Sequence, residues 1–333
     1  MTPLVSILIP AYNAERWIAD TIRSALAQTW PRKEIIIVDD GSRDQTRRVA
    51  RQFASGEVSV VAQENQGAAA ARNNAFELCQ GDYIQWLDAD DLLSPDKIAK
   101  QMAAAERCED KCRLFSSGWG YFTFRADKAR FVPSALWCDL TPLEWMLRKW
   151  EGNDHMQTAT WLVSRKLTEV AGPWDTRLMG DDDGEYSCRV VLASSGVHFV
   201  GDAKVYYRNV DSGRWSHIGR SNRKLDAHLL SRELQIGYLL STQNSERVRA
   251  ACLTYLQTSY HNFYPEQVAL VNQSQKLAAM LGGRLEIPKL SWKYRWIQKL
   301  FGFTVAKRVR QRWNVSKSFV MRSWDEALFR LEG

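Results

Sequence analysis

Short apolar runs alternate with helix-like segments over the first hundred residues of the chain. Residues 5–9, 34–38, 58–62 and 83–87 have the length and composition of buried strands. Between them, apolar residues recur at three- and four-residue intervals over 17–26, a cap at 42 or 44 starts a helix through 53, and an Ala-rich segment covers 67–79. This alternation predicts a mostly parallel sheet with helices on both faces.

Acidic residues follow two of these strands. Asp39-Asp40 comes after the second strand, and Asp88-Ala89-Asp90-Asp91 comes after the fourth. The carboxyl ends of parallel strands meet at one edge of the sheet, where ligands bind, so these carboxylates are expected in one crevice. They repel one another unless a cation joins them, and Mg²⁺ or Mn²⁺ held by one or two carboxylates completes its shell with phosphate oxygens. The alternative is that Asp merely favours turns after strands, and it competes more strongly at 39–40 than at 88–91.

Composition sets the class of protein. The chain has 333 residues, of which 45% are hydrophobic and 25% charged, so a folded protein of about two domains is expected, and collagen-like, disulfide-rich and disordered classes are excluded. The six cysteines lack framework spacing, which indicates a reducing compartment. No run of ~18 apolar residues is present, so we expect a cytoplasmic protein that is at most peripheral to a membrane.

Positive charge is concentrated near the C-terminus. Residues 284–322 hold eleven Lys and Arg against one acid, Glu286, for a local net charge of +10, while the whole chain carries +7. The rest of the chain is therefore slightly acidic. A basic segment at one end indicates a docking surface more than it describes the main body.

Four segments, in this order and spacing, resemble the family 2 glycosyltransferases with the GT-A fold: VSILIPAYN (5–13), IIIVDDGSRDQT (35–46), ENQGAAAARNNA (64–75) and GDYIQWLDADDLLSPDKI (81–98). A weaker stretch over 172–208 resembles the acceptor half of that fold. The resemblance implies an α/β, Rossmann-like GT-A sheet with helices on both faces. Residues 1–100 would form its nucleotide-sugar half, residues 101–225 its acceptor half, and residues 226–333 a helical C-terminal region.

The resemblance implies a nucleotide-diphosphate sugar as donor, with a UDP-sugar as the favoured one. Ala11 and Tyr12 would lie against the nucleobase, and Asp39 would accept a hydrogen bond from it. Arg72 would reach the nucleotide from its helix. The alternatives are that Tyr12 is a buried core tyrosine and that Arg72 is a solvated residue or an ion-pair partner.

The run Asp88-Ala89-Asp90 matches the family's DxD-type motif. Asp88 would contact ribose or sugar, and Asp90 would ligate the Mg²⁺ or Mn²⁺ that bridges the diphosphate. His217 is a candidate to complete the metal shell or touch the diphosphate, although a single His is more often structural. Residues 211–215 have the spacing of the QxxRW motif of processive synthases without its Gln, which disfavours a processive polymerase.

An inverting transfer also needs a base that deprotonates the acceptor hydroxyl. The acidic cluster 181–185 lies at the start of a predicted helix, where charged carboxylates are favoured. In the family an acid pair precedes an arginine of this helix, and counting back from Arg189 selects Asp183 as base, with Asp182 as runner-up. The cluster departs from the family by its first Asp and by extra acids on both sides, and helix capping is the alternative role.

These features predict an inverting, metal-dependent glycosyltransferase of the hexosyltransferase type, with a glycan or glycolipid acceptor in cell-surface polysaccharide assembly. One alternative is a nucleotidyltransferase, which would carry a Gly- and Lys/Arg-rich phosphate loop where this chain has residues 10–13, PAYN. The other is a membrane-attached sugar-nucleotide binding protein without turnover.

The basic segment 284–324 also carries aromatic residues at helical spacing, on two predicted helices separated by Gly302. Lysines and arginines beside rows of aromatic side chains are typical of helices at the surface of an anionic membrane. We therefore expect docking on the inner face of the membrane, where a lipid-linked glycan acceptor would be presented. The alternative is that these rows pack on the catalytic domain. Nucleic acid is disfavoured as a partner because the main body is net acidic. The tryptophans of the segment are Trp292, Trp296, Trp313 and Trp324.

Overall fold

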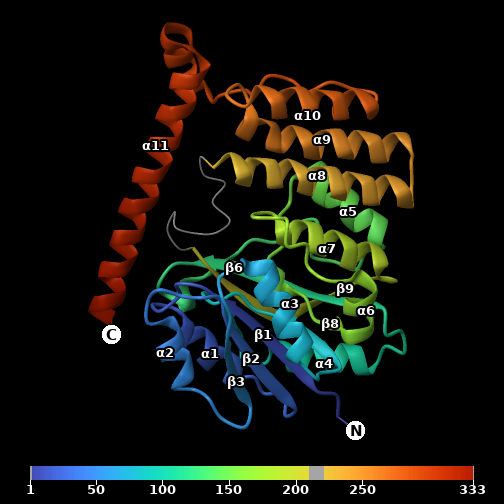
Figure 1. The fold of residues 1–333 in the computed structure, drawn as a ribbon, viewed down its shortest axis with the longest axis vertical. Helices are drawn as coiled ribbons and strands as arrows, with labels where there is room; N and C mark the ends of the chain where they lie inside the picture. The colour runs from blue at the N-terminus through green and yellow to red at the C-terminus, as the bar shows by residue number, and fades with distance from the viewer. Residues whose placement is uncertain (1, 210–220, 333) are drawn as a thin grey trace.

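The computed structural model describes residues 2–209 and 221–332. Figure 1 shows a sheet-based part that carries the N-terminus and a layer of helices stacked on it. The first sheet has the strand order β3-β2-β1-β4-β8, and its first four strands are parallel, as predicted, while β8 is antiparallel to β4. The strands are β1 (Val5–Ala11), β2 (Lys33–Asp39), β3 (Val58–Ala62), β4 (Tyr83–Trp86) and β8 (Val163–Ser164).

Both faces of this sheet are covered by helices, which confirms the predicted layers. Successive side chains of a strand point to opposite faces, so Ile7 and Ile9 of β1 pack with α1 (Ile18–Leu26) and α2 (Thr46–Arg51). Leu8 lies on the other face, in the core that α3 (Ala68–Leu78) shares. The predicted ends of α1 and α3 are correct to within one residue. Helix α2 begins at Thr46, after both predicted cap positions 42 and 44, and ends two residues before the predicted end at 53.

A second, smaller sheet lies beside the first and was not predicted. Its order is β5-β9-β6-β7, in which the long strands β6 and β9 are parallel, and α4 (Lys97–Glu106) packs on them. The strands are β5 (Leu92–Leu93), β6 (Arg113–Phe122), β7 (Arg130–Phe131) and β9 (Gly196–Arg208). Because β5 directly follows the acidic run 88–91, this sheet fixes the loop that carries those acids.

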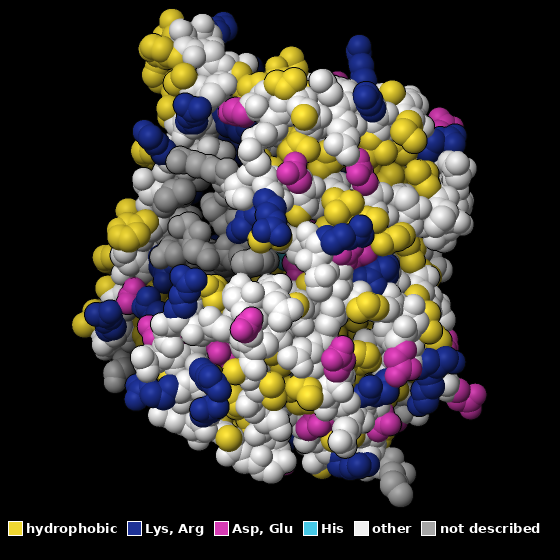
Figure 2. All heavy atoms as spheres, in the orientation of Figure 1, with side chains coloured by type: hydrophobic (Ala, Val, Ile, Leu, Met, Phe, Trp, Pro, Cys, Tyr) yellow, Lys and Arg dark blue, Asp and Glu magenta, His cyan; other side chains and the backbone are white. Residues whose placement is uncertain are grey.

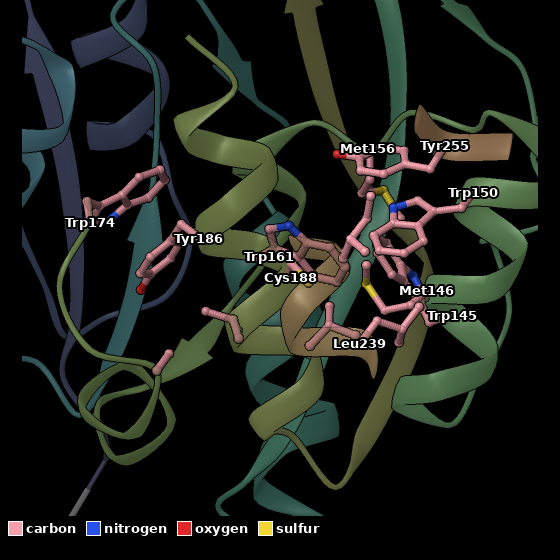
Figure 3. Close-up of a cluster of buried hydrophobic side chains, with 14 of the residues drawn as sticks. Trp145, Met146, Trp150, Met156, Trp161, Trp174, Tyr186, Cys188, Leu239 and Tyr255 are labelled. Carbon is pink, nitrogen blue, oxygen red and sulfur yellow. The ribbon is translucent and has the colours of Figure 1, made fainter. Parts of the chain in front are cut away.

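An aromatic core joins the sheets to the C-terminal helices. Figure 3 shows Trp145, Trp150 and Trp161 gathered in this core. Trp150 stacks on Tyr255 with ring centres 4.3 Å apart, so the C-terminal helical layer and the sheet-based part share one hydrophobic core. The helices around it are α5 (Pro142–Gly152), α6 (Arg165–Ala171), α7 (Asp182–Ala193), α8 (Asn222–Thr242), α9 (Glu246–Phe263) and α10 (Val268–Met280).

The last helix, α11 (Trp292–Glu332), runs along one side of the molecule from the C-terminal layer to the sheet-based part (Figure 1). Gly302 has φ +82° and interrupts the helix, as the sequence predicts. Just after this break, Lys307 pairs with Glu266 at 2.7 Å and anchors α11 to the C-terminal layer. In Figure 2 hydrophobic and basic side chains lie exposed along this side. Among the described residues, no helix has the length and hydropathy needed to cross a bilayer.

Candidate functional site

A cavity of about 450 Å³ opens at the carboxyl edge of the first sheet. The end of β1 and the loop after β4 form one side of it, and the first turns of α3 and α7 form another. Other lining residues include His155, Gln157, Thr158, Tyr207 and Arg322. Parallel α/β sheets bind ligands at this edge, so the cavity lies where the strand order predicts it.

Seven of the nine residues singled out from the sequence line this cavity. One exception is Asp39, which ends β2 just behind the wall, and its neighbour Asp40 lines the cavity instead. The other is His217, which lies outside the described residues. The seven are Ala11, Tyr12, Arg72, Asp88, Asp90, Asp182 and Asp183.

Asp39 and Asp40 have different surroundings although both are buried. The Oδ1 atom of Asp39 accepts no hydrogen bond from any group that the structure describes. Asp40 is fully engaged, because its carboxylate accepts hydrogen bonds from the Gln63 side chain at 2.8 Å and from the backbone N–H groups of Gln66 and Gly67 at 2.9 Å. Asp40 therefore fixes the start of α3, and Asp39 retains an acceptor for another donor.

Arg72 lies at the centre of the site. Its guanidinium donates to Asp182 at 2.7 Å and to Asp88 at 2.8 Å, and its Cζ lies 4.3 Å from the ring centre of Trp174. Trp174 stacks in turn on Tyr186, with ring centres 3.9 Å apart (Figure 3). A buried arginine held in this way positions two carboxylates from opposite sides of the cavity. Arg72 is thus the ion-pair partner that the sequence left as an alternative.

Burial raises the pKa of Asp182 to about 6, although the nearby charge of Arg72 opposes this rise. The neighbouring carboxylates Asp183 and Asp88 act in the same direction as burial. Asp182 therefore takes up a proton just below neutral pH, and its ion pair with Arg72 is complete only above that range.

The acidic cluster 181–185 separates into two structural acids and two acids that line the cavity. Asp181 accepts hydrogen bonds from Ser231 at 2.7 Å and Gln235 at 3.0 Å, both on α8. Glu185 pairs with Arg189 at 2.7 Å. Of the two acids that line the cavity, Asp182 pairs with Arg72. Asp183 accepts the backbone N–H of Gly184 at 2.9 Å and forms no ion pair with a described residue. The extra acids in the cluster therefore hold α7 and α8 in place.

The loop after β4 is fixed by hydrogen bonds from other parts of the chain. Asp91 is fully buried and accepts the backbone N–H of Arg208 at 2.8 Å, and the Arg208 side chain donates to the backbone carbonyl of Asp90 at 2.8 Å. Gln157 also donates to the Asp91 carboxylate. These bonds fix the backbone beside Asp90, whose side chain lines the cavity.

The donor set at this edge fits a metal that shares its shell with phosphate. Within the described ranges, no three His, Cys, Asp or Glu side chains converge on one point. Asp88 and Asp90 both line the cavity, and one or two carboxylates are what Mg²⁺ takes when phosphate oxygens and water supply its other ligands. The residues therefore suit a cation delivered with a diphosphate better than a cation held by protein alone.

Several lining residues were missed by the sequence analysis. Most of them come from segments without a recognisable motif, whereas Arg322 belongs to the basic segment 284–324 that the sequence assigned to docking, and only the fold brings them to the cavity. A signal for them was absent because each is distant in sequence from the acidic runs. They are Trp17, His155, Gln157, Tyr207 and Arg322.

Comparison with known proteins shows which family the first half of the chain resembles. Residues 6–161 match the model of glycosyl transferase family 2. The putative teichuronic acid biosynthesis glycosyltransferase TuaG of Bacillus subtilis is 47% identical over 103 residues, which cover 30% of this chain and 41% of TuaG. Escherichia coli chondroitin synthase is 43% identical over 113 residues, which cover 33% of this chain and 16% of that enzyme. The chain thus spans less than half the length of these relatives.

Solved structures of S. aureus TarS share the fold over most of the chain. The complex of TarS residues 1–349 with UDP-GlcNAc superposes with a TM-score of 0.68 at 16% identity, and covers 84% of this chain and 81% of that one. The complex with UDP gives a TM-score of 0.61 at 17% identity and covers 91% and 80%. Over residues 6–161, the chain is thus similar to glycosyl transferase family 2.

Proposed function

We propose that the protein is an inverting, metal-dependent glycosyltransferase that moves a sugar from a UDP-sugar to a glycan or glycolipid acceptor in cell-surface polysaccharide assembly. One observation carries this proposal. A single cavity is lined by the acids of the DxD-type motif, Asp88 and Asp90, and by a carboxylate from another element, Asp183. A metal-assisted leaving group and a base need this arrangement.

The nucleotide is assigned to the side of the cavity formed by the ends of β1 and β2. Ala11 and Tyr12 line the cavity there, and Tyr12 is 39% exposed, so its ring is accessible to the nucleobase. The unsatisfied Oδ1 of Asp39 suits a hydrogen bond from the nucleobase. Arg72 approaches the nucleotide and also orients Asp88 toward ribose or sugar.

Asp90, with Asp88 beside it, would hold Mg²⁺ or Mn²⁺ together with the diphosphate. When bound, the ion stabilises the negative charge that develops on the leaving diphosphate. The protein contributes a fixed loop for this purpose, because Arg208 binds the backbone carbonyl of Asp90 and Gln157 binds the side chain of Asp91.

Asp183 is the proposed base. The acceptor oxygen forms a bond to the anomeric carbon, the bond from that carbon to the β-phosphate oxygen breaks, and the hydroxyl proton passes to the Asp183 carboxylate. Asp182 is less suited, because it is buried and already accepts a hydrogen bond from Arg72 at 2.7 Å. The attack comes from the face opposite the leaving group, which inverts the anomeric configuration.

We assign residues 1–100 to donor binding, residues 101–225 to acceptor binding, and residues 226–333 to support and attachment. Acceptor chemistry is suggested by the relatives, since TuaG is named for teichuronic acid biosynthesis and another relative is a chondroitin synthase. Both names refer to polysaccharides, which supports a glycan acceptor.

Attachment is assigned to an anionic membrane surface on the cytoplasmic side, through residues 284–324. The tryptophans of this segment do not pack on the catalytic domain: Trp292 is 74% exposed and Trp313 is 65% exposed. Exposed tryptophans beside lysines and arginines suit the headgroup region of a bilayer. Each lysine or arginine near the surface contributes about 1 kcal/mol to membrane binding.

Vesicle sedimentation tests this attachment. At low salt, the protein should sediment with phosphatidylglycerol vesicles and far less with phosphatidylcholine vesicles. The double variant Trp292→Ala, Trp313→Ala should lose most of this binding. A matched control, Val268→Ala with Met280→Ala, removes side chains on α10 that are 65% and 82% exposed and should bind as the parent does. Equal binding by both variants would contradict the assignment.

Transfer itself is tested with a panel of radiolabelled nucleotide sugars and oligosaccharide acceptors, with Mg²⁺ or Mn²⁺ and with chelator. We expect label to pass from a UDP-sugar to an acceptor only when the metal is present. Release of pyrophosphate from a nucleoside triphosphate and a sugar phosphate would instead show a nucleotidyltransferase. Binding of the nucleotide sugar without transfer or hydrolysis for any acceptor would show a binding protein.

A further inference from the structure

The last turns of α11 are fixed to the sheet-based part of the molecule. Asp325 pairs with Arg125 at 2.8 Å and accepts the backbone N–H of Phe124 at 3.0 Å. One residue later, Glu326 pairs with Arg16 at 2.6 Å, across 310 positions of sequence. Phe124 also packs on Phe329, with ring centres 6.1 Å apart. These contacts hold the end of α11 against the loop after β1 and the end of β6.

The same contacts bring Arg322 to the cavity. Residues three apart on a helix share a face, so Arg322 lies on the side of α11 that Asp325 fixes to the protein. Its Cζ is 5.6 Å from the ring centre of Phe124, whose ring lies 5.6 Å from that of Trp17. Both Trp17 and Arg322 line the cavity. Arg322 thereby becomes part of a site built mostly from the first hundred residues.

The charges around the cavity give Arg322 a specific use. Two arginines are found among the described lining residues, Arg72 and Arg322, and Arg72 orients Asp88 and Asp182. A nucleoside diphosphate brings further negative charge into a cavity that is already acidic. The guanidinium group binds phosphate oxygens through paired N–H donors. The lining carboxylates are Asp40, Asp88, Asp90, Asp182 and Asp183.

We propose that Arg322 is a donor-binding residue, supplied by the C-terminal helix, that contacts the diphosphate of the nucleotide sugar. This inference rests on the proposed function, because it requires that a nucleoside diphosphate occupies the cavity. The contacts of Asp325 and Glu326 then position Arg322, and α11 completes the donor site as well as attaching the protein.

Calorimetric titration with UDP and with uridine, in the presence of Mg²⁺, tests the proposal. The variant Arg322→Gln should bind UDP about 10- to 100-fold more weakly, since it loses charge-assisted hydrogen bonds, while uridine should bind as before. Arg322→Lys should recover part of the UDP affinity, because it restores the charge without the paired donors. The double variant Asp325→Asn, Glu326→Gln should weaken UDP binding while keeping Arg322.

A matched control is Arg312→Gln, which removes the same charge from an exposed position of α11 outside the cavity and should leave UDP affinity unchanged. Unchanged UDP affinity in Arg322→Gln would overturn the proposal. So would an equal loss of UDP and uridine affinity, which would indicate a general structural role. Failure of the unsubstituted protein to bind UDP at all would instead overturn the proposed function.

Discussion

Removing the charge of Arg72 should destabilise the protein in a pH-dependent way. The guanidinium lies 2.7 Å from the buried Asp182 and 2.8 Å from the partly exposed Asp88. The variant Arg72→Gln leaves Asp182 as a buried carboxylate without its cation. Breaking a buried pair on one side costs about 3–5 kcal/mol of unfolding free energy, so we expect a loss of this size at pH 8.

The sign of the pH effect follows from the pKa of Asp182, which burial raises from 3.8 to about 6 even with Arg72 present. An acid with a raised pKa in the folded state binds its proton more tightly there than in the unfolded chain. Stability therefore falls as pH rises between these values, by ~1.4 kcal/mol per pH unit at most, and in the parent the fall ends near pH 6. Without Arg72 the pKa rises further, so in Arg72→Gln the fall continues above pH 6.

Urea denaturation at pH 5 and pH 8, followed by tryptophan fluorescence, measures the effect. The stability difference between parent and Arg72→Gln should be small at pH 5, where Asp182 is protonated in the variant, and large at pH 8. Loss of the contact with Trp174 adds about 0.5–2 kcal/mol at both pH values. The double variant Arg72→Gln, Asp182→Asn should recover much of the loss at pH 8. An equal loss at both pH values, or no recovery in the double variant, would refute the reasoning.

Two further predictions concern the catalytic acids. Asp183→Asn should lower the transfer rate by about 10²–10⁴ while UDP affinity stays nearly unchanged, since a base acts on the acceptor. Steady-state kinetics with calorimetry checks this, and an active Asp183→Asn beside an inactive Asp182→Asn would move the base by one position. Asp90→Ala should abolish the metal-dependent part of UDP binding and leave the thermal unfolding midpoint nearly unchanged, because the loop is fixed through Asp91. Calorimetry with and without chelator checks it, and equal UDP affinity in both conditions for the parent would contradict it.

The parallel sheet could be predicted because its central strands β1, β2 and β4 are short, mostly apolar runs buried on both faces, which is a local signal. The edge strand β3 is partly exposed but keeps a β-branched apolar sequence. The acids at its edge could be predicted for the same reason, since the carboxyl ends of parallel strands must meet. The second sheet could not be predicted, because its two long strands are distant in sequence. Arg113 of β6 is paired with Gly196 of β9, and no local pattern encodes such a pairing. The position of Arg322 depends on contacts between residues that are still further apart in the sequence.

The ion-pair partners within the site also could not be predicted from the sequence. A pattern of residues shows that Arg72 precedes the acidic run, but not that its guanidinium lies between Asp88 and Asp182. The roles of Asp181 and Glu185 as anchors of α8 and Arg189 likewise appear only when the helices are packed. Burial decides which carboxylates are paired, and burial is a property of the whole fold.

The helical continuity of α11 has a consequence for the choice of acceptor. After Gly302 the helix contains no further non-helical residue, so Trp313 and Arg322 are held at a fixed spacing. Nine residues at 1.5 Å each separate them by about 14 Å along the axis. On the proposed function, one end of this rod rests among lipid headgroups while the other borders the donor. The sugar that accepts transfer must then stand at a set height above the bilayer, so the protein selects its acceptor by length as well as by chemistry.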